Sequence, residues 1–479
     1  MRLLIALLVV RLWIMPLANS FWLDEAIIAN NVREGLRHIF TTQLIALQSV
    51  AFCVVEWLVA QAAGTSEIAL RLPSLLAAIG AVFAIYRLGK EVADSNAGLL
   101  CALLFVTRPD LAIQVPNARP YALALLCHIA AMLWLARWMR EPRVKYAALW
   151  LACAVAATHL HHLFGVALAL ECAVALLCVQ RHMRAARLKQ LIIGITAAVL
   201  LLLPALPQAM VFFEHRKLLS FTSRPGIGNL IATLAPWYVL LPLALTTVLA
   251  LLAGHRPRSA KPAGDSRGLI LAVAVGLVPA VGFFLLSTLT DARLFSTRYL
   301  LPAMPGIVLF WGLLLRRIEP LGVPRVALAA AAVLVALQLG GLQPVPDYRG
   351  EDWRAAVNAL PESGDLLVYS GLVECRRLDW LQDPFRWKYL ASPLLAYRPA
   401  ADPRATHLLP FQMAEADTSY ADRLVSGRLA GSRRVAVLAI RRFDGPGWVN
   451  WVAVRLRSAG FVERRRSHYR AIEVAVFER

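Results

Sequence analysis

Two adjacent carboxylates stand where the chain leaves an apolar run. Asp24 and Glu25 belong to the stretch NSFWLDEAIIANN (19–31), which directly follows MRLLIALLVVRLWIMPLA. An acidic residue at a helix start complements the helix dipole and caps free N–H groups. A carboxylate held at a membrane surface can also take a proton from a hydroxyl while a lipid-bound leaving group departs. Phe21 and Trp22 beside the pair suit the headgroup zone, which favours the catalytic interpretation over capping.

A second acidic residue and a cation occur together in TRPDLAIQVPNARPY (107–121), which contains Asp110 and Arg119. In one interpretation Arg119 binds an anionic headgroup and Asp110 faces the same cavity. In the other, Arg119 is an interfacial side chain that extends its charge to water. The residues themselves leave both interpretations open.

Three histidines cluster in ATHLHHLFG (157–165). His159 and His162 are three residues apart, which predicts one shared helix face, and His161 is then expected to point elsewhere. A metal pair would need a third ligand at a matching spacing, which the sequence does not provide. We therefore expect His159 and His162 to hydrogen-bond to a phosphate or a sugar.

Two further segments carry cations, EHRKLLSFTSRPG (214–226) and TDARLFSTRYLLPAMPG (290–306). Lys217, Arg293 and Arg298, together with Arg216, are candidates for a phosphate clamp, although a solvated loop charge is the alternative for each. The chain has no Walker A sequence, no GxGxxG and no Asp-x-Asp motif. A soluble nucleotide or nucleotide-sugar site is therefore unsupported.

The elements that position these residues follow from composition. The chain has 479 residues, of which 59% are apolar, and a mean hydropathy of +0.60. Apolar runs of about 18 to 25 residues recur, the length that a helix needs to cross a bilayer. The sequence therefore predicts a polytopic membrane protein. The first run lacks a small-residue cleavage site, so we expect it to be a retained span.

The net charge of +20 does not indicate nucleic-acid binding, because Lys and Arg concentrate in the short loops between spans. With the N-terminus in the cytoplasm, cation-rich loops alternate with loops of mixed sign. The seven cysteines form no CxxC pair, so no redox motif and no thiolate metal site is indicated. Eleven spans are expected, near 2–19, 68–86, 95–112, 120–137, 146–162, 164–180, 190–212, 231–253, 268–288, 299–315 and 322–343.

The apolar stretch 43–62 is expected not to cross, since a twelfth span would invert the charge alternation. Thr42, Ser49 and Glu56 are seven residues apart and would form one polar stripe, which is costly against lipid. We expect a helix along the outer surface, within a long first outer loop (20–67). Arg11 and Glu171 lie within spans, and such groups usually face the bundle interior.

After residue 343 the sequence changes character. Helices are expected at 347–360 and 447–460, and strands at 364–371, 433–442, 461–466 and 470–479. This alternation predicts a mainly α membrane domain (1–343) followed by a small α/β domain (344–479) on the outer side. The small domain is expected either to hold an acceptor or to cap the active-site cavity.

The segments FWLDEA, NARPYALALL, THLHHLFG and TRYLLPAMPG occur in an order that resembles a known family. Over residues 1–320 the chain is similar to the bacterial GT-C fold glycosyltransferases that use polyprenyl-phosphate sugars. The resemblance implies a multi-span helical bundle of the bacterial cytoplasmic membrane with its site on the outer, periplasmic face. It also implies a lipid-linked sugar donor and a lipid, polysaccharide or protein acceptor.

Residue by residue, the resemblance makes Asp24 and Glu25 the acidic pair of the first outer loop, with Asp24 the base. It makes Asp110 the second acidic residue, and it places Arg119, His159 and the pair Arg298–Tyr299 in the family's remaining motifs. Some members of the fold bind a divalent cation near the acidic pair, so a metal is possible. The segment LQSVAF (47–52) departs from the family, since relatives often carry a proline there, and this affects the acceptor site most.

The expected reaction is a single inverting displacement at the anomeric carbon. A multi-span transporter or lipid flippase is the main alternative, and it predicts inverted repeats and broken helices near the midplane. The sequence shows neither of these. A polymerase or ligase of another membrane fold is disfavoured by the acidic pair directly after the first span.

Overall fold

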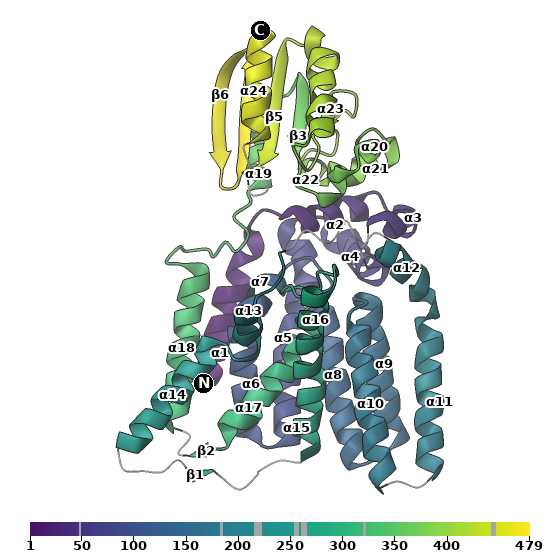
Figure 1. Ribbon diagram of the computed structural model, residues 1–479, viewed down its shortest axis with the longest axis vertical. Coiled ribbons are helices and arrows are strands. Elements are labelled where there is room, and N and C mark those ends of the chain that lie inside the picture. Colours follow the sequence, from purple (N-terminus) through teal and green to yellow (C-terminus); the bar gives the residue numbers. More distant parts are fainter. Residues whose placement is uncertain are drawn as a thin grey trace. The chain divides into compact units, whose positions relative to one another are not determined.

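The chain folds into two compact units. The computed structural model describes residues 1–46, 49–182, 185–214, 223–252, 258–259, 266–319, 322–441 and 447–479 (Figure 1). The helical unit comprises Met1–Leu17, Ser49–Phe52 and Arg71–Tyr348. The sheet unit comprises Ala18–Gln48, Cys53–Leu70 and Arg349–Arg479, so the first outer loop groups with the C-terminal residues.

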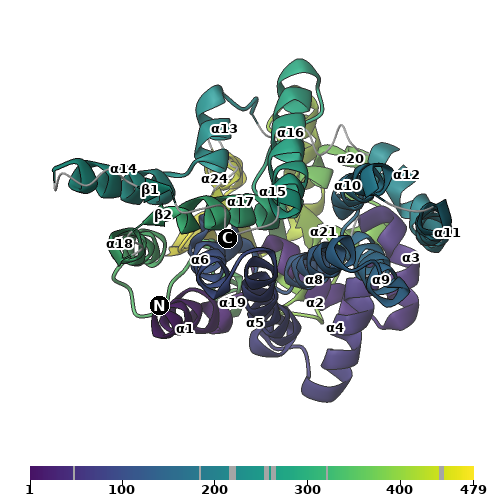
Figure 2. The ribbon, with the colours of Figure 1, turned by 90° about the horizontal axis from the view of Figure 1, so that it is seen from below.

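The helical unit is built from apolar helices that run next to one another. Figure 2 views several of them end-on, with α8, α9 and α10 side by side. The helices of this unit, with α5 beginning in the sheet unit, are α1 (Arg2–Val9), α5 (Glu67–Val92), α6 (Ser95–Thr107), α7 (Pro109–Gln114), α8 (Tyr121–Arg140), α9 (Val144–Leu160), α10 (Phe164–His182), α11 (Ala185–Leu202), α12 (Leu206–Glu214), α13 (Ile227–Leu234), α14 (Trp237–Leu252), α15 (Ser266–Ala272), α16 (Val278–Leu289), α17 (Met304–Arg316) and α18 (Gly322–Gly340). A two-stranded ladder pairs β1 (Arg258–Ser259) with β2 (Ile318–Glu319).

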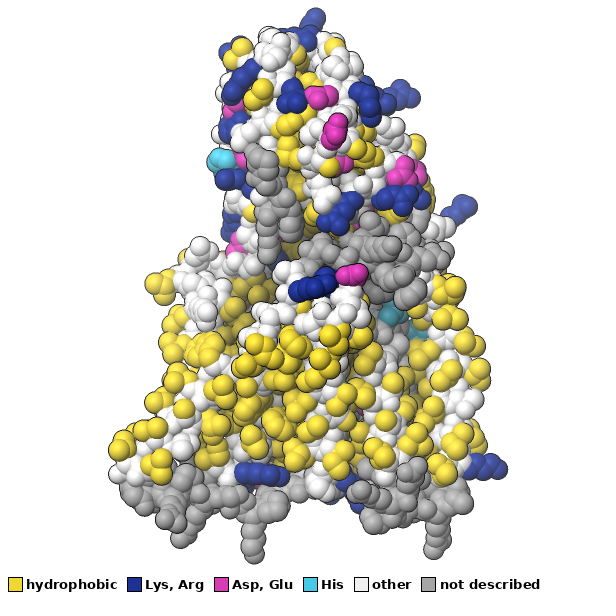
Figure 3. Space-filling model, in the orientation of Figure 1, with side chains coloured by type: hydrophobic (Ala, Val, Ile, Leu, Met, Phe, Trp, Pro, Cys, Tyr) yellow, Lys and Arg dark blue, Asp and Glu magenta, His cyan; other side chains and the backbone are white. Residues whose placement is uncertain are grey.

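On the face shown in Figure 3, most of the coloured side chains of these helices are hydrophobic. Within the described residues, five helices are long and apolar enough to cross a membrane, or up to seven if each of two bent pairs is one span. The chain is therefore an integral membrane protein. Shorter apolar helices occupy most of the other expected spans, and the number eleven stays a prediction.

One bent pair joins α13 to Trp237–Leu249 at 66°. A broken helix is not expected there, because 231–253 is one apolar run in the sequence. Pro236 is the physical reason, since its ring disfavours the helical conformation of the preceding residue. Ala235 accordingly leaves the helix, with φ −134° and ψ 70°.

Close helix packing relies on small residues at one crossing. A Cβ added to Gly276 would lie 2.5 Å from the carbonyl carbon of Gly306 on α17. No larger side chain fits without moving a backbone, so glycine lets these helices touch.

Two charged residues of the spans have partners inside the unit. The guanidinium of Arg11 donates to the carbonyls of Gly340, Gly341, Gln343 and Pro344, at 2.8 to 3.2 Å, and so caps the end of α18. Glu171 of α10 is fully buried, which confirms that it faces the interior.

Glu171 belongs to a buried network that joins four elements, namely α8, α9, α10 and a short turn. Its carboxylate accepts a hydrogen bond from Trp150 Nε1 at 2.6 Å and lies 3.1 Å from His128 Nδ1. The other nitrogen of His128 lies 3.1 Å from the carbonyl oxygen of Pro302. Pro302 belongs to a short turn, Leu301–Ala303, directly after Arg298 and Tyr299. The network therefore ties α8 and α10 to the turn that follows Tyr299.

The sheet unit contains the first outer loop as α2 (Leu23–Arg33), α3 (Leu36–Ala46) and most of α4 (Val50–Ala63). The expected single helix over 43–62 is therefore wrong, because α3 and α4 are separate helices. The strands are β3 (Asp365–Tyr369), β4 (Thr406–Leu408), β5 (Arg434–Ile440), β6 (Val462–Tyr469) and β7 (Ile472–Glu478), in the order β4-β3-β5-β7-β6. The strand β3 runs parallel to β4 and β5, and β7 runs antiparallel to β5 and β6.

The small helices of the sheet unit are α19 (Trp353–Asn358), α20 (Leu378–Leu381), α21 (Pro384–Leu390), α22 (Ser392–Leu395), α23 (Glu415–Ser426) and α24 (Trp448–Ser458). All four expected strands and the helix at 447–460 are confirmed. The helix expected over 347–360 is shorter in the structure, where only α19 forms. Asp352 caps this helix, which therefore begins at Trp353. The sequence did not predict β4, since three residues carry too little periodicity.

The Glu171 network leads to a prediction about stability. Replacing either Glu171 or His128 by alanine leaves a buried polar partner behind, which typically costs about 3–5 kcal/mol. We expect each variant to unfold at a clearly lower temperature than the parent chain in detergent, and the double variant Glu171→Met/His128→Leu to recover most of that loss. Leu177→Ala, a 60% exposed position on the same helix, is the control and should change little. Equal unfolding temperatures for Glu171→Ala and this control would contradict the prediction.

Candidate functional site

The acidic pair lies in the first turn of α2. The helix begins after Trp22, whose backbone is extended, with φ −87° and ψ 170°. Glu25 is fully buried, and its Oε2 accepts a hydrogen bond from the Trp22 N–H at 3.2 Å. Asp24 is partly exposed. The two carboxylates therefore differ, because Glu25 holds the helix start while Asp24 keeps accessible surface.

A third carboxyl group, that of Glu56 on α4, interacts electrostatically with Glu25. Glu56 is 0% exposed, and neither of its carboxyl oxygens has a hydrogen-bond partner among the described residues. Burial and, secondly, the negative charge of Glu25 raise the pKa of Glu56 to about 9. Glu56 is therefore an uncharged acid at neutral pH. The seven-residue spacing marked it only as part of a polar stripe, and nothing in the sequence relates it to Glu25.

A cationic cluster lies in the helical unit. Arg119 is buried, with a guanidinium nitrogen 3.4 Å from the Tyr121 hydroxyl and Cζ 5.5 Å from the centre of that ring. Arg298 lies against Tyr299, with its Cζ 5.2 Å from the ring centre. Each guanidinium thus lies against an aromatic ring, whose negatively polarised face attracts and orients it.

His161 brings the two arginines into one cluster. It lies in the turn between α9 and α10, outside the helices, and its ring centre is 5.6 Å from that of Tyr121. Burial first, and then the positive charges of His162, Arg119 and Arg298, together lower the pKa of His161 to about 3. Its buried Nδ1 has no hydrogen-bond partner among the described residues. The expectation that His161 points away from the site residues is therefore wrong.

The helix face expected for His159 and His162 is not formed, because α9 ends at Leu160. His161 is extended, with φ −157° and ψ 113°, and His162 follows in the turn. His159 Nε2 lies 3.0 Å from the carbonyl oxygen of Leu201, and His162 hydrogen-bonds to the Gln208 side chain. The local sequence could not show this, since a helix end changes the direction of every later side chain.

Two other predicted site residues have local partners. Asp110 Oδ2 lies 3.0 Å from Nη2 of Arg108, whose side chain is only 4% exposed. Arg293 donates to the carbonyls of Ser287 and Thr290 at 3.0 and 2.7 Å, and so caps the end of α16. Lys217, with Arg216, lies outside the described residues.

Among the residues that the structure describes, no group of three or more His, Cys, Asp or Glu side chains is arranged to hold a metal ion. The described cysteines, Cys53, Cys101, Cys127, Cys153, Cys172 and Cys375, form no disulfide.

These features define a polytopic membrane protein with a small mixed α/β domain, and comparison with known proteins identifies the fold. Residues 50–210 match the family model described as dolichyl-phosphate-mannose-protein mannosyltransferase. A search of curated proteins finds no match.

Solved structures match over nearly the whole chain. ArnT from Cupriavidus metallidurans in the apo state has a TM-score of 0.54 at 12% identity, covering 99% of this chain and 97% of that one. The same protein bound to undecaprenyl phosphate has a TM-score of 0.52 at 15% identity, with the same coverage. Arabinofuranosyltransferase AftD from Mycobacteria has a TM-score of 0.53 at 14% identity, covering 99% of this chain and 39% of that one. The chain therefore has the GT-C fold, as the order of its motifs indicated.

Glu56 leads to a prediction about pH. Because its folded pKa of about 9 lies above the ordinary value of 4.5, the native chain holds one more proton than the unfolded chain between these pH values. Stability is therefore full below the ordinary value and falls by up to about 1.4 kcal/mol per pH unit as pH rises toward the folded pKa. Glu56→Gln removes this loss, so the variant should gain stability relative to the parent from about pH 5 to about pH 8.

Thermal unfolding in detergent across this pH range measures the effect. Glu415→Gln, an exposed glutamate at the start of α23, is the matched control and should follow the parent chain at every pH. A constant difference between Glu56→Gln and the parent at all pH values would contradict the prediction.

Proposed function

We propose that the chain is a membrane glycosyltransferase that transfers a sugar from a polyprenyl phosphate to an acceptor hydroxyl. We place the reaction on the outer face of the bacterial cytoplasmic membrane, with the C-terminal domain (344–479) on the periplasmic side. The fold supports this proposal, since the matched ArnT structure contains undecaprenyl phosphate. The family model matched by residues 50–210 describes a mannosyltransferase that uses a lipid-linked sugar.

The observation that carries the proposal is the cluster of Arg119, Arg298 and His161. Two oriented guanidinium groups beside a half-buried imidazole suit a phosphate, which takes short charge-assisted hydrogen bonds from several donors. Burial is the main cause of the low pKa of His161, and a bound anion would relieve the repulsion from the two arginines that adds to it. Tyr299, which supports Arg298, is itself buried.

The proposed step is a single displacement with inversion. The acceptor oxygen forms a bond to the anomeric carbon as the bond from that carbon to the phosphate oxygen breaks. Asp24 receives the hydroxyl proton, and the polyprenyl phosphate leaves with the bonding electron pair. The cationic cluster stabilises the charge that develops on the phosphate.

The remaining predicted residues take supporting roles in this proposal. Glu25 and Arg293 act chiefly through the helix ends that they cap, and Asp110 balances buried Arg108. His159, His162 and Lys217 stay candidates for contacts with the sugar or phosphate. A lipid, a polysaccharide or a protein can supply the acceptor hydroxyl, and titration of activity with EDTA tests the divalent cation.

The central test is Asp24→Asn, which keeps the shape of the side chain and removes its basicity. Transfer from a lipid-linked sugar in vesicles should fall by about 10²–10⁴-fold. Asp422→Asn, an exposed residue paired with Arg455 on α24, should retain full transfer. Full transfer by Asp24→Asn would exclude this base, and movement of the donor across the bilayer without transfer would support a transporter instead.

The cationic cluster has its own test. Arg119→Gln and Arg298→Gln should each weaken binding of a polyprenyl phosphate by about tenfold or more, since each removes about 1.5–3 kcal/mol of charged hydrogen bonding. Arg224→Gln replaces a cation of the same predicted outer side whose side chain is 65% exposed, and should bind like the parent chain. Binding can be measured by competition against the lipid-linked donor. Loss of affinity in all three variants to the same extent would show a non-specific charge effect and contradict the assignment.

A further inference from the structure

The backbone that leads into Asp24 is held almost residue by residue by the C-terminal segment of the sheet unit. We propose that Tyr397, with Arg354, is a positioning residue for Asp24, so that the C-terminal domain sets the place of the proposed base. This proposal rests on the proposed function of Asp24. It gives the C-terminal domain a role in the reaction that needs no substrate contact.

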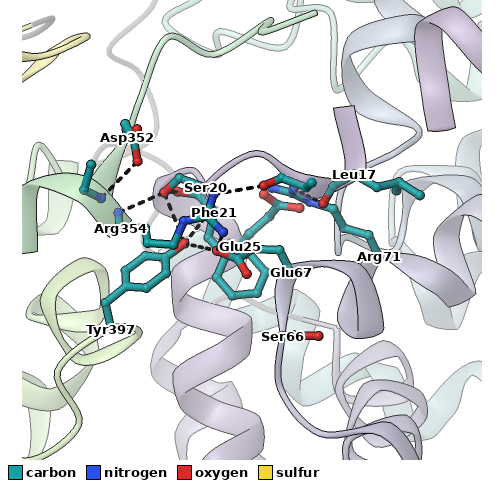
Figure 4. A network of polar contacts seen from close by, with 12 residues as sticks. Leu17, Ser20, Phe21, Glu25, Ser66, Glu67, Arg71, Asp352, Arg354 and Tyr397 are labelled. Carbon is teal, nitrogen blue, oxygen red and sulfur yellow. Dashed lines mark hydrogen bonds and ion pairs between the residues drawn. The ribbon is translucent and has the colours of Figure 1, made fainter. Parts of the chain in front are cut away.

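The hydroxyl of Tyr397 is the centre of the arrangement. It accepts a hydrogen bond from the Phe21 N–H at 2.7 Å, donates to Glu67 Oε1 at 2.9 Å and lies 3.1 Å from Ser20 Oγ (Figure 4). One phenol has a single proton and two lone pairs, so these three contacts use its whole capacity. Phenylalanine at position 397 would remove the hydroxyl and with it the contacts to Phe21, Glu67 and Ser20.

The Tyr397 hydroxyl keeps the proton that it donates. Burial and the neighbouring negative charge of Glu67 raise its pKa well above the ordinary value. The contact with Glu67 is thus a charge-assisted hydrogen bond, which is stronger than one between neutral groups.

Arg354, the second residue of α19, contacts the same segment through both its backbone and its side chain. Its backbone N–H donates to Ser20 Oγ at 3.1 Å, and its guanidinium donates to the Ala18 carbonyl at 3.0 Å. The guanidinium also donates to Glu67 Oε1 at 3.1 Å, the oxygen that Tyr397 contacts (Figure 4). Glu67 therefore links Tyr397 to Arg354, and both of these residues also contact Ser20.

The next two residues toward Asp24 are held as well. Arg349 lies over the Trp22 ring, with Cζ 3.8 Å from its centre. The Leu23 N–H donates to Glu351 Oε2 at 3.1 Å, and the same oxygen accepts from Trp353 Nε1 at 2.9 Å. Every residue from Ser20 to Leu23, directly before the proposed base, thus contacts a residue of 349–354 or Tyr397.

Holding the backbone before Asp24 in place matters more if Asp24 is a general base than if it only binds substrate. General-base catalysis needs the carboxylate within hydrogen-bond reach of the proton in the transition state. A misplacement of about 1 Å can lower the rate by about 10²-fold while substrate contacts elsewhere persist. Loosening the segment is therefore expected to lower kcat and to leave the KM for the lipid-linked donor nearly unchanged.

The test is Tyr397→Phe, which keeps the ring that packs against Phe21, with centroids 6.1 Å apart, and removes the hydroxyl. We expect kcat to fall about 10- to 100-fold with little change in donor KM. Amide hydrogen exchange of the peptide containing Phe21 to Asp24 should become faster. Tyr369→Phe is the matched control, because its hydroxyl donates to the Phe411 carbonyl at 3.1 Å in the same domain and it should alter neither quantity.

Arg354→Met provides a second variant if Tyr397→Phe folds poorly, since it removes only the guanidinium bonds to Glu67 and Ala18. It should show faster exchange of the same peptide and a smaller fall in kcat. Unchanged exchange in this peptide, or a kcat for Tyr397→Phe equal to that of Tyr369→Phe, would overturn the proposal. If Asp24→Asn transferred sugar normally, the proposed base would be wrong, whereas the exchange data would still decide whether Tyr397 holds the segment.

Discussion

The hydrocarbon of the membrane is the constraint on which the rest of the structure depends. It offers no hydrogen bonds, so every polar group at that depth must find its partner within the protein. Arg11 does so by capping the end of α18, and Glu171 by contacting Trp150 and His128. The same constraint explains why the helices are almost wholly apolar on their outer surface and why the few charged residues inside them join elements far apart in the chain.

Chemistry is consequently confined to helix ends and to the loops between helices. Arg119, His161 and Arg298 come from three such connections, and each of the two guanidinium groups lies against an aromatic ring. The positive charges of both arginines act on the imidazole of His161. Burial first, and these charges second, lower the pKa of His161.

Three carboxyl groups of the first outer loop differ in burial and in their contacts. Glu25 is buried and caps α2, Glu56 is buried and uncharged, and Asp24 alone of the three keeps accessible surface. Glu25 thus supports the helix start, Glu56 stays uncharged because of its burial, and Asp24 is the proposed base. The bonds that precede Asp24 come from residues 349–397, so the small α/β domain and the first outer loop form one compact unit.

Periodicity and length in the sequence by themselves determined the membrane class, most helices, the four longer strands and, through the order of short motifs, the GT-C fold. They could do so because hydrophobic burial repeats along the chain. Only the tertiary structure decided that His161, rather than a helix face of His159 and His162, lies near the two arginines. It also decided that Glu56 interacts electrostatically with Glu25 and that Tyr397 hydrogen-bonds to the segment before Asp24. These pairings depend on where helices end and on contacts between residues from tens to hundreds of positions apart, which leave no periodic trace in the sequence.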